Sequence, residues 1–235
     1  MAVLLSACAQ PSRTAESFPT LTRIMTALPT TIIRSASTIS PTETPILPAS
    51  PTSVPPALIL ADFPLSLGAS WKYSAEITYQ GPNDYTKDVT WSGFITDEVI
   101  DQKTTPGEKI VFTLKEDLEP TPPQDVWRQS RTYEYTVSGN GIFEGKMKIY
   151  QWPLSDRLIW KSIPDFGYDM NADYVGDVET PYGTLKGCYE FRIVTNPDTS
   201  IDTFCPRVGF VNHSYMHHGT PQIEHFVLVA YKSGQ

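Results

Sequence analysis

The first 60 residues of the chain lack the side chains from which a protein core is made. They contain no glycine and one aromatic residue, Phe18, although the whole chain has 14 glycines, 5 tryptophans, 12 tyrosines and 10 phenylalanines. They do hold 9 of the 21 prolines and 18 serine or threonine residues. Such a segment cannot offset the entropy cost of ordering its backbone. We therefore expect a disordered Thr/Ser/Pro-rich linker over residues 9–57 and a folded domain over residues 58–235.

Basic residues are scarce after position 60, where 15 of them stand against 24 acidic residues. A surface with this balance repels nucleic acid, because it gains nothing from the release of phosphate counterions. We therefore exclude nucleic acid as a partner. The chain also has no run of 18 apolar residues, so the sequence predicts no transmembrane helix.

Cysteine is rare too, with three in 235 residues. Leu5, Ser6 and Ala7 before Cys8 resemble the lipobox of bacterial lipoproteins, in which small residues precede a lipidated cysteine. Upstream the pattern is incomplete, because only AVLL stands for the apolar core of a signal peptide. We interpret residues 1–8 as a truncated lipoprotein signal peptide, with a chance cysteine in a disordered tail as the alternative. Acyl chains on Cys8 would anchor the chain to a membrane outside the cytoplasm.

Alternating side chains dominate the rest of the sequence. Residues 71–80 (WKYSAEITYQ) alternate between apolar and polar without a break, which is typical of a half-buried antiparallel strand. The pair Gly93–Phe94 interrupts a similar pattern and favours a bulge, and no segment has helical periodicity. We predict a mainly β domain with one curved antiparallel sheet or a barrel-like meander. Further strands are expected over residues 89–100, 108–117, 132–139 and 142–152.

The second and third cysteines lie on the two arms of a predicted hairpin. Its turn contains Pro197, and a loop of residues 195–198 sets Cys188 opposite Cys205, where a disulfide closes. Alternation puts both cysteines on the more polar face, beside Glu190 and Arg192. A disulfide indicates an oxidising compartment. The alternative, a metal-binding or catalytic thiol pair, is less favoured because there is no C-x-x-C pair.

Three segments together resemble an uncharacterised family of exported bacterial proteins, many of them lipoproteins. They are FPLSLGASWKY (63–73), VETPYGTLKGC (178–188) and FCPRVGFVNH (204–213). The matching motifs are Pro-Leu-x-x-Gly-x-x-Trp-x-Tyr, Thr-Pro-x-Gly-Thr and a Gly-Val-Gly-type turn, in which Arg207 replaces the first glycine. The resemblance implies a mostly β domain. It implies no catalytic residues.

Two clusters of polar residues raise the question of a metal. A hairpin turning at residues 219–220 places His213, His217 and Glu224 on one face, a set that suits zinc. On a straight strand, however, the two histidines lie about 13 Å apart, so a polar, partly exposed hairpin is the alternative.

The second cluster resembles the start of a calcium loop of the D-x-N-x-D type. Its residues are Asp169, Asn171 and Asp173. The pattern then fails, because Tyr174 stands where the loop needs glycine and Thr180 where it needs glutamate. An acidic loop that faces water is the alternative.

Tryptophans offer candidate ligand contacts. Trp71 and Trp91 lie on the apolar faces of alternating strands, which predicts core positions. Trp152 and Trp160 stand near expected loops, so we expect them to be exposed and take them as candidates for contacting a sugar or lipid.

No sequence motif indicates an enzyme. There is no G-x-S-x-G elbow and no phosphate-binding glycine loop. The adjacent carboxylates Asp97–Glu98 and Glu116–Asp117 stand at expected strand ends, where solvation explains them better than glycosidase chemistry.

We expect a lipid-anchored extracytoplasmic lipoprotein with a non-catalytic binding or structural domain. The alternative is a carrier of a lipid or other hydrophobic ligand in a curved-sheet cavity, and the lesser alternative is a metal-dependent enzyme. No cofactor is predicted. The expected partners are a membrane through Cys8 and either a hydrophobic ligand, a cell-envelope glycan or a protein, with the chain as a monomer.

Overall fold

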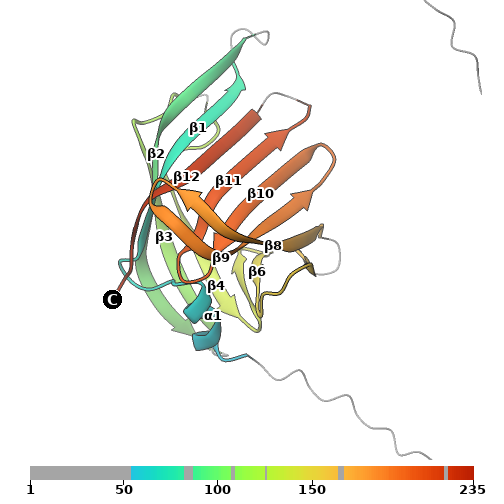
Figure 1. Ribbon diagram of the computed structural model, residues 1–235. Coiled ribbons are helices and arrows are strands. Elements are labelled where there is room, and N and C mark those ends of the chain that lie inside the picture. Colours follow the sequence, from blue (N-terminus) through green and yellow to red (C-terminus); the bar gives the residue numbers. More distant parts are fainter. Residues whose placement is uncertain (1–53, 82–86, 107–108, 125, 164–166, 220–221) are drawn as a thin grey trace, which may run out of the picture. The chain divides into compact units, whose positions relative to one another are not determined.

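The computed structural model describes residues 54–81, 87–106, 109–124, 126–163, 167–219 and 222–235 (Figure 1). The proposed lipidation site Cys8 and nearly all of the predicted linker lie outside these ranges. The described residues form one short helix and a set of antiparallel strands. In chain order these are α1 (Pro56–Asp62), β1 (Ser70–Gln80), β2 (Asp88–Thr105), β3 (Lys109–Glu119), β4 (Arg131–Ser138), β5 (Gly141–Glu144), β6 (Met147–Gln151), β7 (Leu158–Lys161), β8 (Asp169–Thr180), β9 (Gly183–Val194), β10 (Asp198–Cys205), β11 (Gly209–His217) and β12 (Gln222–Lys232).

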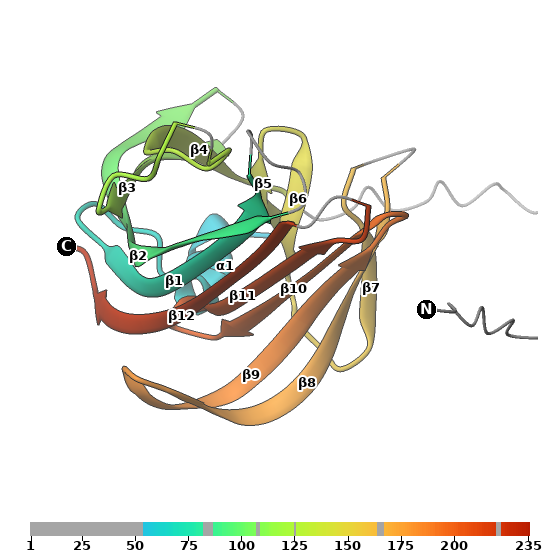
Figure 2. The ribbon, with the colours of Figure 1, turned by 90° about the horizontal axis from the view of Figure 1, so that it is seen from above.

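All of these strands belong to a single sheet in the order β6-β5-β4-β3-β2-β1-β12-β11-β10-β9-β8-β7. The first and last strands are neighbours in its middle, so the chain runs out to one edge, crosses to the other and returns. The two edges meet: the Lys148 amide donates to the Ser162 carbonyl at 2.6 Å, and the Trp160 indole donates to the Lys148 carbonyl at 3.0 Å. The sheet therefore curls into a nearly closed barrel (Figure 2), which confirms the predicted fold class.

The helix α1 lies across one end of the barrel (Figures 1 and 2). Its Ile59 is fully buried, and the ring of Phe63 contacts the rings of Tyr150 and Phe204 at centroid distances of 5.8 and 5.3 Å. The sequence analysis missed this helix because seven residues make only two turns, too few for a periodic pattern. In the described residues, no helix has the length and apolar character needed to cross a membrane.

The predicted bulge at Gly93–Phe94 is wrong. The β1–β2 register runs evenly through Gly93, and the irregularity lies between Val99 and Asp101 in the β2–β3 pairing. Gly93 interrupts the alternation for a different reason. A Cβ there would lie 2.4 Å from the Glu119 carbonyl oxygen, so only glycine allows this close approach.

The predicted register of the β9–β10 hairpin agrees with the structure, which pairs Val194 with Thr199 and continues toward the two cysteines. Cys188 and Cys205 form a disulfide with a Cα–Cα distance of 4.2 Å. They are 0% and 1% exposed, so the disulfide is buried, although Glu190 and Arg192 on the same strand are not. The reason is tertiary: the end of the β8–β9 hairpin folds back over β12 (Figure 1), where Tyr182 contacts the ring of Tyr231, and this covers the outer face.

Arg207, which replaces the glycine of the third motif, adopts a left-handed backbone conformation with φ of 68°. Glycine reaches this region without steric cost, whereas an arginine pays a penalty through its Cβ atom. The turn thus keeps the shape that a glycine favours, and its amide donates to the carbonyl of Asp62 at 2.6 Å.

Candidate functional site

A cavity of about 460 Å³ lies inside the barrel. Every strand except β7 contributes side chains to its wall, together with Arg128 from the connection between β3 and β4. Its volume falls within the range of about 300–1,000 Å³ that is typical of small-molecule pockets. The wall combines charged side chains with apolar ones, which include Ile95, Ile149, Met170 and Ile193.

Strand alternation delivers carboxylates to this cavity. Asp97 pairs with Trp71 on one side and with Glu116 on the other, so the two carboxylates face inward together. Glu98 and Asp117, one residue further along, face outward and are exposed. The expectation that both adjacent pairs are solvated is therefore wrong for Asp97 and Glu116, and the Glu116 side chain is only 1% exposed.

Arg128 holds the inward-facing carboxylates. Its Nη2 donates to Glu116 at 2.5 Å and its Nη1 to Glu224 at 3.2 Å, while Arg131 Nε donates to Glu116 at 3.2 Å. Burial opposes the charged form of Arg128, but the two glutamates outweigh burial and raise its pKa. Burial raises the pKa of Glu224, and Arg128 and His213 oppose that shift. Removing one partner of a buried ion pair is costly, because the other charge is then buried without compensation. This cost favours the observed geometry of the network.

His213 and His217 have separate carboxylate partners. His213 Nδ1 lies 2.5 Å from Asp202, and His217 Nδ1 lies 2.6 Å from Asp198. Burial lowers the pKa of His213, but Asp202 and Glu224 outweigh it, so the net pKa is raised. Hydrogen bonds from His217 and Tyr215 lower the pKa of Asp198.

The proposed zinc set is thus only partly brought together. His213, His217 and Glu224 share the inner face, as predicted, and His213 Nε2 lies 3.8 Å from Glu224. His217, however, is bonded to Asp198 instead. Within the described ranges, no group of three or more His, Cys, Asp or Glu side chains is placed to hold a metal ion.

The proposed calcium residues lie on a strand. Asp169, Asn171 and Asp173 occupy alternate positions at the start of β8, about 7 Å apart in an extended chain. Asp169 forms an ion pair with Lys161 at 2.9 Å. Both readings of this segment as a loop, calcium-binding or merely acidic, are therefore wrong.

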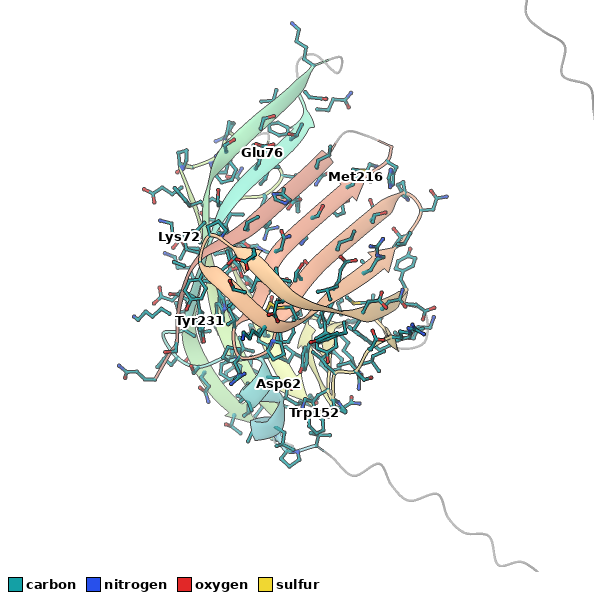
Figure 3. All side chains as sticks on the ribbon, in the orientation of Figure 1. Asp62, Lys72, Glu76, Trp152, Met216 and Tyr231 are labelled. Atoms are coloured by element: carbon teal, nitrogen blue, oxygen red, sulfur yellow. A yellow bond between two sulfur atoms is a disulfide. The ribbon has the colours of Figure 1, made fainter. Side chains whose placement is uncertain are left out.

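The predicted positions of Trp71 and Trp91 are confirmed, whereas that of Trp160 is wrong. Trp71 and Trp91 are 4% and 6% exposed, as predicted for core residues. Trp160 is also buried, at 6% exposure, and packs edge-on against Phe191, so its expected exposure is wrong. Trp152 is half-buried and lies at the α1 end of the barrel (Figure 3). Neither Trp152 nor Trp160 lines the cavity.

Three residues named in the cavity wall each have one side-chain polar atom that is buried and lacks a hydrogen-bond partner within the described part of the chain. These atoms are Asp97 Oδ1, Asn212 Oδ1 and Arg128 Nε. Asn212 pairs with Thr203 and Val227, so alternation directs its side chain to the outer face of the sheet. Burial, with a smaller contribution from Glu116, raises the pKa of Asp97 to about 7, although Arg128 and the Tyr133 hydroxyl oppose the shift. Since buried polar groups in proteins are nearly always paired, an unpaired oxygen on an inward-facing carboxylate sets Asp97 apart.

Comparison with known proteins gives a distant likeness only. No family model matches the chain, and no curated protein matches it. Two similar solved structures are a Bacteroides fragilis protein described as exported, with a YmcC-like fold, and a Parabacteroides distasonis protein described as a lipoprotein. Each is 10% identical, and each likeness covers 71% of this chain and 96% of the other; the TM-scores are 0.42 and 0.39. Scores below 0.5 support no conclusion about a shared function.

Proposed function

We propose that this protein is a lipid-anchored extracytoplasmic binding protein whose barrel holds a small molecule without transforming it. The observation that carries the proposal is the cavity of about 460 Å³, whose wall combines charged and apolar side chains. A barrel that served only as a scaffold would fill its interior with side chains, as small barrels do. A ligand supplies the missing volume.

The composition of the wall favours an amphiphilic ligand. Charged groups around Arg128 lie across from apolar side chains such as Ile149 and Met170. A pure hydrocarbon would leave the charged groups without water or partners, which is costly. The sequence suggested a carrier of a hydrophobic ligand. The cavity wall instead favours a carrier or receptor of a molecule with a polar end.

The proposed location outside the cytoplasm is supported by the sequence and by one structural feature. Leu5 to Cys8 resemble a lipobox, and the segment that follows has the composition of a linker. The Cys188–Cys205 disulfide supports an oxidising compartment outside the cytoplasm.

The test is to identify what the cavity carries. The full chain is purified from its host under native conditions and unfolded, and the released small molecules are measured by mass spectrometry. Ser200 lines the cavity on β10, and its neighbour Ile201 does not, so Ser200→Phe fills the cavity and Ile201→Phe is the matched control. We expect wild type and Ile201→Phe to release the same molecule and Ser200→Phe to release little. No released molecule from wild type, or equal release from all three, contradicts the proposal.

A further inference from the structure

Asp97 stands where the main cavity meets a second, smaller space. A void of about 20 Å³ shares part of its wall with the main cavity. The shared residues are one carboxylate and four aromatic side chains: Asp97, Tyr73, Tyr133, Tyr135 and Phe210. The carboxylate that lacks a hydrogen bond at Oδ1 is thus surrounded by rings.

The charges of the cavity are unbalanced toward the negative. Five carboxylates line it, against two guanidinium groups and the imidazole of His213, which is paired with Asp202. Both guanidinium groups are already engaged: Arg128 contacts Glu116 and Glu224, and Arg131 contacts Glu116 and Glu144. In the described part of the chain Asp97 forms no ion pair of its own. The electrostatic potential around Asp97 therefore favours a cation.

The rings around Asp97 have the chemistry to receive such a cation. Arg131 already lies over the ring of Tyr133, with its Cζ 4.7 Å from the ring centroid. Tyr133 and Tyr135 pack edge-on at 5.2 Å, which fixes the orientation of the two rings. The hydroxyl of Tyr73 is committed to the Phe210 carbonyl at 3.0 Å. Aromatic faces beside a carboxylate form the kind of site that binds organic ammonium groups.

We propose, building on the function proposed above, that the ligand of the barrel is an organic cation. Its ammonium group, protonated or quaternary, contacts Asp97 among the rings of Tyr73 and Tyr135, and its apolar part extends into the main cavity. An anionic ligand fits worse, because the carboxylate of Asp97 would repel it.

The experiment compares head groups on one chain length. Hexyltrimethylammonium, hexylamine, hexanol and hexanoate are titrated into the purified full chain at pH 8 by calorimetry. We expect the two cations to bind at least about tenfold more tightly than the alcohol and the acid, since a desolvated charge pair with a cation–π contact is worth about 1.4 kcal/mol or more. Equal or tighter binding of hexanol or hexanoate overturns the inference, and so does the absence of binding by all four.

The role of Asp97 is isolated by a pair of variants. Asp97→Asn is expected to abolish the preference for hexyltrimethylammonium over hexanol, whereas Glu98→Gln, on the outer face of the same strand, is expected to keep it. Circular dichroism and thermal melts establish that both variants fold. Retention of the full preference by Asp97→Asn overturns the inference.

A pH profile separates ligand binding from a structural role. Hexyltrimethylammonium does not titrate, so its affinity for wild type is expected to rise about tenfold from pH 6 to pH 8 as Asp97 ionises, and to rise less in Asp97→Asn. The charged and titratable groups that act on Asp97 come from three strands, β1, β3 and β4, and from the β3–β4 connection. They are Tyr73, Glu116, Arg128, Arg131, Tyr133 and Tyr135. An unchanged profile in Asp97→Asn counts against the inference.

The two proposals fail separately. If wild type releases a neutral or anionic molecule in the mass spectrometry above, the binding function stands and the cation assignment is wrong. If wild type releases nothing and none of the four probes binds, both are wrong.

Discussion

Asp97 is a carboxylate that the fold buries without supplying a partner for Oδ1. Its pKa of about 7 lies above the ordinary 3.8, first because of burial and then because Glu116 faces it across the β2–β3 pair. The folded state therefore holds the Asp97 proton more tightly than the unfolded chain does. This stabilisation is present at low pH and is lost as the pH rises through 7.

The first prediction concerns this loss. Between pH 5 and pH 8 we expect Asp97→Asn to lose less unfolding free energy than wild type, by on the order of 2 kcal/mol, because the asparagine does not ionise. Urea unfolding of the ligand-free chain at the two pH values measures the difference. Glu98→Gln is the control and should follow wild type. Parallel behaviour of Asp97→Asn and wild type would contradict the assigned shift.

The second prediction concerns Arg128, the cation that two buried glutamates share. Arg128→Met leaves Glu116 and Glu224 buried without it, and we expect a loss of about 3–5 kcal/mol at pH 8. The loss should shrink at pH 5, because burial raises the pKa of Glu224 and this glutamate then takes up a proton more readily. Arg157→Met, at a side chain that is 86% exposed, should change stability by less than about 0.5 kcal/mol. Similar effects of the two variants would argue against the network.

At the scale of elements, alternation and not local composition decides what enters the barrel. On β3 the inner face reads Phe112, Leu114, Glu116 and Leu118, all buried, so the glutamate occupies a core position in an apolar series. This was the available signal that the sequence analysis missed. An acidic residue in phase with the apolar face of a strand indicates a buried, functional or paired carboxylate.

The third prediction concerns Leu58 and Ile59, two adjacent aliphatic residues of α1 that differ in exposure. Ile59 is fully buried and Leu58 is 46% exposed. Ile59→Ala should therefore cost about 2–5 kcal/mol, because it leaves a hole in the packing at the end of the barrel. Leu58→Ala should cost well under 1 kcal/mol. Chemical denaturation of both variants measures the difference, and equal costs would mean that α1 does not close the core.

At the scale of the whole molecule, the chain places its first and last strands side by side and brings its two sheet edges together. Such closure removes exposed strand edges, which is how a barrel avoids pairing with other chains. It also gathers side chains from distant strands around one cavity. Arg128 joins β3 and β12 by contacting both Glu116 and Glu224.

The fourth prediction concerns the attachment of this molecule to a membrane. When the complete natural gene is expressed in its host, we expect the protein in the membrane fraction, with acyl chains on Cys8. Cys8→Ser should remove the acyl mass and leave the protein unanchored, whereas Ser12→Ala should behave as wild type. Mass spectrometry of the amino-terminal peptide and cell fractionation measure both. Wild-type protein without an acyl group would refute the anchor.

Local patterns were sufficient for the strands and for the β9–β10 register, because side-chain alternation and turn geometry act between near neighbours in the chain. They were also sufficient to place Trp71 and Trp91 in the core. They misplaced Trp160 and did not show that the disulfide is buried, since burial depends on what folds over the strand from elsewhere.

Residue patterns along the chain are enough to indicate an acidic β domain behind a linker-like segment, with two cysteines placed to bridge one hairpin. The near closure of the sheet, the inward orientation of Asp97 and Glu116, and the aromatic rings around Asp97 depend on contacts between distant strands. Alternation assigns each residue to one face of a strand, but the curvature of the sheet determines whether that face lines a cavity or meets water.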